Sequence, residues 1–147
     1  MSDAQRGPAQ RLAERVVEGM LARDEFSRWL GIEVVEIQPA RCICTMTVRD
    51  DMVNGFGVAH GGIVFSLADS AFAFACNTQG KIAMSIENGI TYPAPVHPGD
   101  VLTAVAVEES ASRRLGYYRA VVTNQKQETV GIFHGTVYKT SQEHPLS

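Results

Sequence analysis

The sequence predicts an α+β domain in which an antiparallel sheet of five or six strands wraps around one long buried helix. Three observations lead to this prediction. The segment Gly61–Thr78 is apolar and long enough for a buried helix, and strand-like segments separated by turn residues make up most of the chain after it. The length of 147 residues suits one domain with its own core. We expect this domain over residues 12–140, between a flexible N-terminus over residues 1–11 and a polar tail over residues 141–147.

The individual elements follow from hydrophobic spacing along the chain. Apolar residues between Leu12 and Leu30 recur at helical spacing, with a break at "ARDE". The segment "IEVVEIQPARCICTMTV" predicts two short strands around a turn at residues 38–40. After the long helix, strands are expected over Ile82–Tyr92, Val101–Ser110, Gly116–Thr123 and Thr129–Lys139, joined by "PAPVHPGD", "SRRLG" and "NQKQE". The loose alternation within the second of these indicates a strand that is buried on both faces.

Composition and charge disfavour several classes of function. The formal net charge of -3 provides no general attraction to nucleic acid or to an anionic membrane. The N-terminal sequence "MSDAQRGPAQR" lacks the apolar region of a secretory signal, and the long apolar segment is too short and too polar to cross a membrane. Cys42, Cys44 and Cys76 are odd in number, which favours reduced thiols and a cytoplasmic location. We expect them to pack in the core, and we expect no metal site.

A single carboxylate, Asp69, lies in the middle of the apolar helix, flanked by Phe65 four residues before it and Phe72 three residues after it. An ionised carboxylate in such surroundings is costly unless it is paired or solvated. It could be structural, with a hydrogen bond to a backbone group or to a hydroxyl such as that of Ser66 or Ser70. It could instead be a general base or nucleophile in a partly dry cleft, with a raised pKa. The residues leave both interpretations open.

The helix is preceded by His60 and begins with Gly61 and Gly62. Glycine lets a ligand approach the backbone closely, and the first N–H groups of a helix have no partner within it. Together with the helix dipole, they can polarise a carbonyl and hold an oxyanion. The alternative is that the two glycines only provide clearance against a neighbouring strand.

The spacing of these two features has a consequence for assembly. Gly61 and Asp69 are eight residues apart, which is about 12 Å along one helix. One chain therefore cannot easily direct both at the same carbonyl. Two antiparallel helices related by a two-fold axis near Phe65 can, so we expect a homodimer with shared sites.

The pattern "N-G-x-x-x-x-H-G-G-x-x-F-x-L-A-D-x-A-F-A-x-A-C-N" resembles the hotdog-fold acyl-CoA thioesterases, and within them the PaaI group of phenylacetic acid degradation proteins. "LGIEVVEI", "MTVRDDMVNG", "SIENGITYPAPVHPGD" and "GYYRAVVTNQKQETVGIFHG" resemble that family in the same order. The resemblance covers roughly residues 29–140. It implies the hotdog fold, a long helix wrapped by an antiparallel sheet, and homodimers that pair into tetramers.

The resemblance also implies roles for five residues. Asp69 matches the catalytic carboxylate, which acts as general base on water or as nucleophile on the thioester carbon. Gly61 matches the residue whose backbone N–H receives the thioester oxygen. Asn54 matches the polar residue that orients the water or substrate, and His60 matches a histidine that holds the loop. Ser85 matches a hydroxyl that assists the carboxylate or its water.

The chemistry of a thioester is compatible with so small a set of groups. Its thiolate leaves readily, so one carboxylate and one oxyanion donor can suffice without a metal or cofactor, coenzyme A being part of the substrate. For the substrate, we expect Gly62, Phe65 and Phe72 to lie near the acyl group. Arg113 and Arg114 could bind the phosphates of coenzyme A or could simply form an exposed hairpin turn.

Two other functions remain open at this point. A hotdog hydratase or dehydratase would pair His60 with Asp69 to move a proton at carbon, and a non-catalytic protein would only bind acyl-CoA. The context of His60 and the presence of Asn54 favour hydrolysis. A phenylacetyl substrate, possible ring hydroxylation included, is implied by the resemblance alone.

Overall fold

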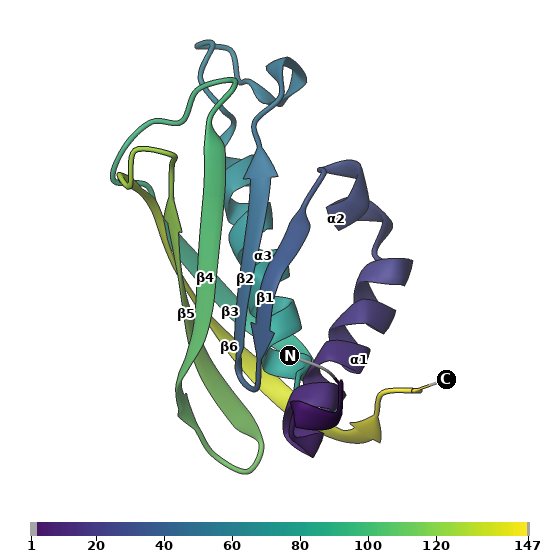
Figure 1. The fold of residues 1–147 in the computed structure, drawn as a ribbon. Helices are drawn as coiled ribbons and strands as arrows, with labels where there is room; N and C mark the ends of the chain where they lie inside the picture. The colour runs from purple at the N-terminus through teal and green to yellow at the C-terminus, as the bar shows by residue number, and fades with distance from the viewer. Residues whose placement is uncertain (1–2, 147) are drawn as a thin grey trace.

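A computed structural model describes residues 3–146 and confirms the expected α+β fold (Figure 1). One six-stranded sheet, in the order β1-β2-β4-β5-β6-β3, curves around the helix α3, and every neighbouring pair is antiparallel. The strands are β1 (Glu33–Gln38), β2 (Arg41–Thr47), β3 (Lys81–Thr91), β4 (Val101–Ala111), β5 (Leu115–Thr123) and β6 (Thr129–Glu143). The helices are α1 (Pro8–Arg23), α2 (Glu25–Trp29) and α3 (Gly61–Asn77), with 3-10 turns at Asp3–Gln5 and Asp50–Met52.

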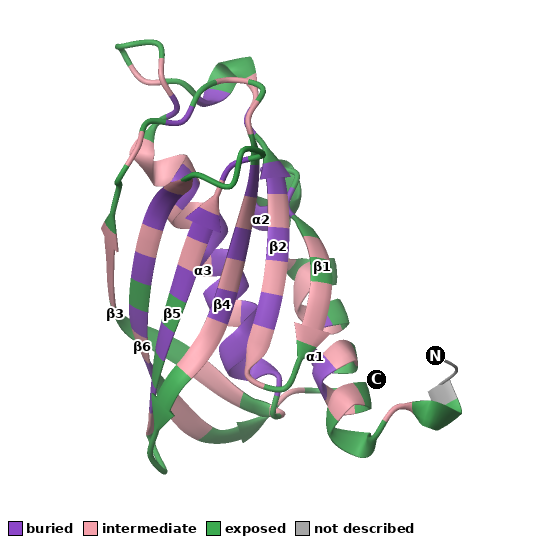
Figure 2. Cartoon of the chain, turned by 60° about the vertical axis from the view of Figure 1, so that its left-hand side comes forward, coloured by how far each residue is buried: buried purple, intermediate pink, exposed green. Residues whose placement is uncertain are grey.

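The helix α3 forms the centre of the core. Its buried residues occur on several sides of the helix, as expected for a helix enclosed by other elements. The ring of Phe72 packs against Tyr118 of β5 and Phe133 of β6, with centroid distances of 5.6 Å and 5.4 Å. Figure 2 shows buried positions alternating along the strands that face α3. In β4, Leu102, Ala104 and Ala106 are buried, whereas the alternate residues are exposed at Val101 and half-buried at Thr103 and Val105. The expectation of a strand buried on both faces is therefore wrong.

The N-terminal helices cover the core beside β1. The break expected at "ARDE" is confirmed, because Asp24 separates α1 from α2 and its side chain accepts a hydrogen bond from the Ser27 N–H at 2.9 Å. The helix α1 begins at Pro8 rather than at Leu12, since proline suits the first position of a helix. The expectation of a flexible terminus is therefore wrong for residues 8–11. Residues 1–2 lie outside the described part of the chain.

The C-terminal strand is also longer than expected. Pairing with β3 extends β6 to Glu143, so residues 141–143 are strand rather than tail. His144 follows in a fixed position, because its N–H donates to Gly80 O at 2.8 Å and its Nε2 lies 2.7 Å from Asn77 Oδ1. Residue 147, at the end of the expected tail, lies outside the described residues.

The strand β3 forms one edge of the sheet. Its pairing with β6 is irregular between Lys81 and Ala83 and again between Ser85 and Glu87. Two of its apolar side chains, Met84 and Ile86, are 61% and 60% exposed.

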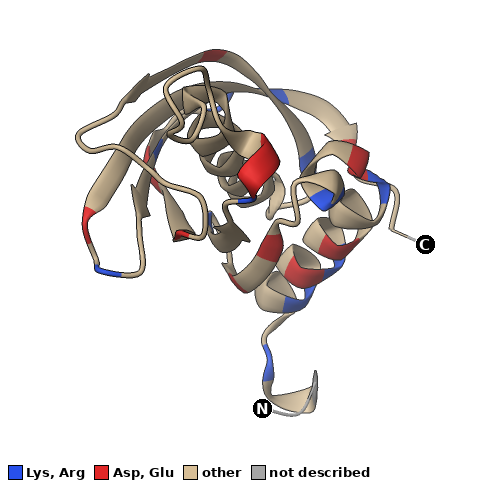
Figure 3. Cartoon of the chain, turned by 90° about the horizontal axis from the view of Figure 1, so that it is seen from above, with Lys and Arg blue, Asp and Glu red and all other residues tan. Residues whose placement is uncertain are grey.

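Acidic and basic residues are interspersed along α1 and the visible strands (Figure 3), so neither charge dominates this view. Within residues 3–146, no helix is long and apolar enough to span a membrane.

Candidate active site

The carboxylate of Asp69 lies halfway along α3 and is half-buried. Its Oδ1 accepts a hydrogen bond from Nδ2 of Asn88, on β3, at 3.2 Å. Burial raises the pKa of Asp69, and the negative charge of Asp24 raises it further. A carboxylate that is partly dry yet reachable is the arrangement expected of a general base or nucleophile.

The two serines expected as structural partners of Asp69 have other partners. Ser66 Oγ donates to Gly62 O at 2.7 Å. Ser70 Oγ lies 2.7 Å from Ser27 Oγ, which in turn donates to Asp24 Oδ2 at 2.6 Å. The structural interpretation based on Ser66 or Ser70 is therefore wrong.

Asn88 is a site residue that sequence reasoning missed. Its Nδ2 donates both to Asp69 and, at 3.1 Å, to Ser85 Oγ, so Ser85 belongs to the same group as the carboxylate. In a regular strand, Ser85 and Asn88 would point to opposite faces because they are three residues apart. The irregular pairing between Ser85 and Glu87 shifts the alternation and brings both side chains to the same face, which the sequence pattern does not reveal. The available signal was a polar residue three positions after Ser85 within an expected strand.

The start of α3 is capped by the side chain of His60. Its Nδ1 accepts the Gly62 N–H at 2.9 Å, a bond in which this ring nitrogen carries no proton. A Cβ on Gly62 would lie 2.9 Å from the same Nδ1, so glycine provides space for the cap. The Ile63 N–H donates to His60 O at 2.9 Å. Among the described residues, the Gly61 N–H alone of these three has no acceptor, and it stays a candidate oxyanion donor.

Tyr92, at the end of β3, contacts the same helix start, and its role was not anticipated. Its hydroxyl donates to Gly61 O at 2.9 Å. A cavity of about 200 Å³ adjoins this bond. Its lining is mostly apolar and consists of Val58, Ala59, Gly61, Val64, Tyr92, Ala94, Pro95, Val96 and Val130. An apolar ring could enter beside Gly61 here.

Asn54 belongs to the loop that leads into α3. Its Oδ1 accepts the Phe56 N–H at 2.9 Å, and its own N–H donates to Val58 O at 2.8 Å. These bonds use Oδ1 and not Nδ2 of the half-buried side chain. Asn54 thus lies at the same end of α3 as Gly61, where its amide could contact a substrate.

The expected catalytic residues fall into two groups within one chain. Asn54, His60 and Gly61 lie at the start of α3, whereas Asp69 and Ser85 lie beside its middle. The helix is continuous from Gly61 to Asn77, so eight residues again correspond to about 12 Å.

The two phenylalanines expected near the acyl group differ in accessibility. Phe72 is fully buried between Tyr118 and Phe133, so the expectation that it contacts substrate is wrong. Its place on the sheet-facing side of α3 explains the difference. Phe65 is half-buried and meets Phe133 edge to face at 5.4 Å, so its position allows contact with a ligand.

Arg113 and Arg114 are exposed in the turn between β4 and β5. They line a cleft of about 690 Å³ together with Lys81, Met84, Tyr138, Lys139, Thr140, Ser141 and Gln142. Met84 lines this cleft while Ser85 contacts Asn88, and consecutive strand residues point to opposite faces. The cationic cleft and Asp69 therefore lie on opposite faces of β3.

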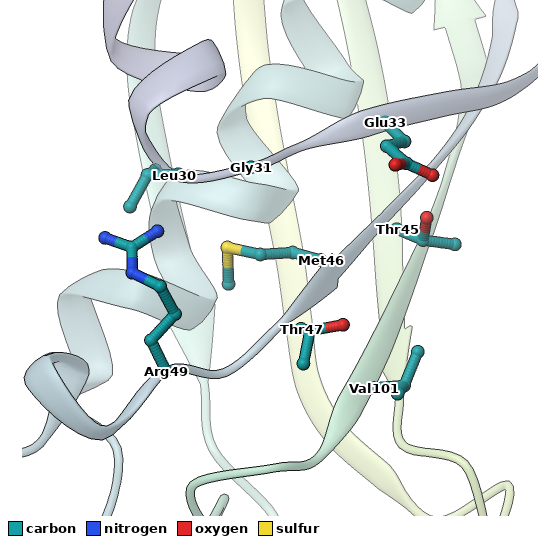
Figure 4. A pocket seen from close by; sticks show the side chains of 8 residues that line it. All are labelled: Leu30, Gly31, Glu33, Thr45, Met46, Thr47, Arg49 and Val101. Atoms are coloured by element: carbon teal, nitrogen blue, oxygen red, sulfur yellow. The ribbon is translucent and has the colours of Figure 1, made fainter.

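Another cavity, of about 240 Å³, lies between the α2–β1 connection and β2 (Figure 4). Arg49 and Glu33 flank it from different sides. The Arg49 guanidinium lies 5.2 Å from the centre of the Trp29 ring and pairs with Asp51 at 3.0 Å, so its charge is already engaged. This cavity contains none of the expected site residues.

The cysteines and possible metal ligands contribute no further reactive group. All three cysteines are free and buried, and Cys42 Sγ lies 3.8 Å from Cys44 Sγ on one face of β2. Burial raises the pKa of Cys76 to about 12, which makes its thiol a poor nucleophile. Within residues 3–146, no three His, Cys, Asp or Glu side chains are placed to hold a metal ion.

Comparisons with known proteins indicate the family and the fold. The profile of the thioesterase superfamily matches residues 56–131, a segment that begins just before α3 and ends within β6. The acyl-coenzyme A thioesterase PaaI of Escherichia coli strain K12 is 38% identical over 120 residues, which are 82% of this chain and 86% of that protein. The acyl-coenzyme A thioesterase 13 of Homo sapiens is 30% identical over 113 residues, 75% of this chain and 81% of that protein.

Solved structures show the same fold. The structure of the E. coli PaaI protein from the phenylacetic acid degradation operon superposes with a TM-score of 0.90 at 35% identity, covering 92% of this chain and 98% of that chain. A Streptococcus mutans UA159 protein bound to acetyl CoA superposes with a TM-score of 0.74 at 26% identity, covering 77% and 91% of the two chains.

Proposed function

The chain belongs to the thioesterase superfamily, as an acyl-CoA thioesterase of the PaaI type, and we propose that it hydrolyses phenylacetyl-CoA-type thioesters with Asp69 as the catalytic carboxylate. The observation that carries this proposal is the half-buried Asp69 carboxylate, held by Asn88 on β3. The name of the phenylacetic acid degradation operon, to which the E. coli PaaI protein belongs, supports an aryl-acetyl substrate. Ring-hydroxylated forms enter the proposal through the resemblance alone.

Ionised Asp69 would act either as general base on a water molecule or as nucleophile on the thioester carbon. Its raised pKa makes it a stronger base than an ordinary aspartate, which assists proton abstraction near neutral pH. The free N–H of Gly61 would stabilise the oxyanion, with Asn54 at the same helix end orienting the substrate or water. No cofactor is required, because the thiolate of coenzyme A leaves without strong acid catalysis.

The separation of about 12 Å between Gly61 and Asp69 requires two chains at each site. We therefore propose that the sites lie at the interface of a homodimer. The resemblance to the family further implies that two such dimers associate into a tetramer. Half-buried Gly62, Ser66, Asp69 and Ala73 recur every three or four residues and form one stripe along α3. Such a stripe beside the exposed apolar edge of β3 is suited to a second copy of the chain.

The acyl and phosphate parts of the substrate would occupy different regions. The aromatic ring of the substrate would occupy the apolar cavity of about 200 Å³ beside Gly61. It would not contact Phe72, which is fully buried. Arg113 and Arg114, in the cleft shared with Lys81 and Lys139, would bind the phosphates of coenzyme A. The extended pantetheine arm would have to pass the β3 edge to connect the two.

A hydratase or dehydratase is less compatible with the geometry, because Nδ1 of His60 is engaged in capping α3. A non-catalytic acyl-CoA-binding protein would have no need of the partly dry Asp69. The buried free cysteines suit a reducing compartment, and we propose a cytoplasmic location.

The test is a thiol-release screen with phenylacetyl-CoA and long-chain aliphatic acyl-CoA. We expect the aryl substrate to be preferred and Asp69→Asn to lower kcat by ~10²–10⁴-fold, as for loss of a general base. A folded Asp69→Asn variant with near-normal kcat would eliminate the catalytic assignment. A preference for long aliphatic chains would eliminate only the aryl pocket, and a change in enoyl absorbance without thiol release would indicate the lyase reaction.

A further inference from the structure

The amide of Asn88 connects the catalytic helix to the edge strand. One Nδ2 group donates to Asp69 Oδ1 at 3.2 Å and to Ser85 Oγ at 3.1 Å. The three side chains come from α3 and from two positions of β3, so a single amide determines how the strand and the helix present their polar groups to each other.

The other half of this amide is in an unfavourable position. Asn88 Oδ1 is buried and, among the described residues, has no hydrogen-bond donor. A buried acceptor without a donor destabilises a fold. Turning the amide over would not help, because it would direct Oδ1 at the Asp69 carboxylate. An apolar side chain of similar shape would avoid this cost.

The opposite strand is shaped to accept the amide. Gly135 of β6 pairs directly with Asn88. A Cβ at Gly135 would lie 2.8 Å from Asn88 Oδ1 and 2.7 Å from Phe72 Cζ, which is too close for either atom. The absence of a side chain at Gly135 therefore lets Asn88 lie beside Phe72 with its Nδ2 directed at Asp69.

We propose that Asn88 is a positioning residue for thioester hydrolysis, which orients the Asp69 carboxylate and the Ser85 hydroxyl at the expense of fold stability. This inference rests on the proposed catalytic function of Asp69. The N–H donation favours the ionised carboxylate and opposes the effect of burial. Asp24, in the α1–α2 connection, also acts on this site, because its negative charge raises the pKa of Asp69. The Asp69 carboxylate in turn raises the pKa of Cys76, two turns further along α3.

The test compares Asn88→Leu and Asn88→Asp with the unchanged enzyme. Asn88→Leu removes the donor and the unpaired oxygen together, so the melting temperature should stay the same or rise. Its kcat should fall about 10-fold, the scale of one hydrogen bond to a charged group, and the acidic limb of the pH profile should move to higher pH. Asn88→Asp keeps the shape but places a second carboxylate beside Asp69, so both effects on activity should be larger.

Asn124→Ala is the matched control. Asn124 is a buried asparagine whose Oδ1 accepts the Lys126 and Glu128 N–H groups at 2.9 Å and 3.0 Å in the β5–β6 turn. Its replacement should lower the melting temperature without moving the pH profile of the folded enzyme.

The outcomes separate this inference from the proposed function. If the unchanged enzyme releases thiol and Asp69→Asn does not, the function holds. Asn88→Leu with the unchanged kcat and pH profile would then overturn the role of Asn88 alone. So would a variant that behaves like Asn124→Ala, with reduced stability and an unmoved acidic limb, because that is the signature of a purely structural residue. An unchanged enzyme without thioesterase activity would overturn both.

Discussion

Replacing Gly61 by proline would remove one N–H group while leaving the helix intact. Proline suits the first position of a helix, as Pro8 shows in α1. The preceding His60 already has φ -61° and ψ 133°, an extended conformation that is compatible with a following proline. The substitution is therefore directed at the proposed oxyanion donor rather than at the fold.

The expected loss of kcat in Gly61→Pro follows from the hydrogen bonds at the start of α3. The Gly62 N–H is held by His60 Nδ1 at 2.9 Å, and the Ile63 N–H by His60 O at 2.9 Å. Neither can replace the lost donor without breaking an existing bond. We expect kcat to fall ~10²–10³-fold, as for loss of one oxyanion-hole donor.

Gly61→Ala is the matched control in a thiol-release assay. A Cβ at this position lies 3.1 Å from the Tyr92 ring, and alanine and proline share that contact. Only proline also removes the N–H. The ratio of kcat between the two variants therefore isolates the donor, and circular dichroism checks that both remain folded.

Mixing Gly61→Pro chains with Asp69→Asn chains tests whether each site is shared. In random dimers with shared sites, about a quarter of all sites would combine an intact Gly61 with an intact Asp69 from the other chain. Equal kcat for Gly61→Pro and Gly61→Ala would refute the oxyanion assignment. No recovery of activity after demonstrated subunit exchange would refute the shared site.

Two further predictions concern charge. Asp24→Asn keeps a good cap for α2 but removes the charge that raises the pKa of Asp69, so the acidic limb of kcat should move to lower pH, while burial still holds that pKa above its usual value; an unmoved limb would contradict this coupling. Replacing Arg113 and Arg114 together by alanine should raise KM for the coenzyme A thioester only several-fold, because the two charges are exposed and screened. The KM of a pantetheine thioester should hardly change, because that substrate lacks the nucleotide phosphates. Equal changes for both substrates would place the phosphates elsewhere.

Much of the fold could be predicted because its signals are local. The run of apolar residues with glycines at its start gives α3, since helix periodicity and helix termini depend on residues a few positions apart. Turn residues located the four later strands to within a few positions. The spacing from Gly61 to Asp69 established a separation that no packing of the single chain can shorten, because a continuous helix is rigid.

The sequence by itself thus determined the central helix, the strand set and the solitary carboxylate within it. Tertiary structure alone decided which side chains meet that carboxylate. The irregular pairing of β3 turns Asn88 inward, Gly135 makes room for it across the strands, and the curvature of the sheet buries Phe72 instead of exposing it to substrate. Strand pairing also extended β6 to Glu143. These outcomes depend on strand register and on contacts between residues far apart in the chain, and local hydrophobic periodicity carries no information about either.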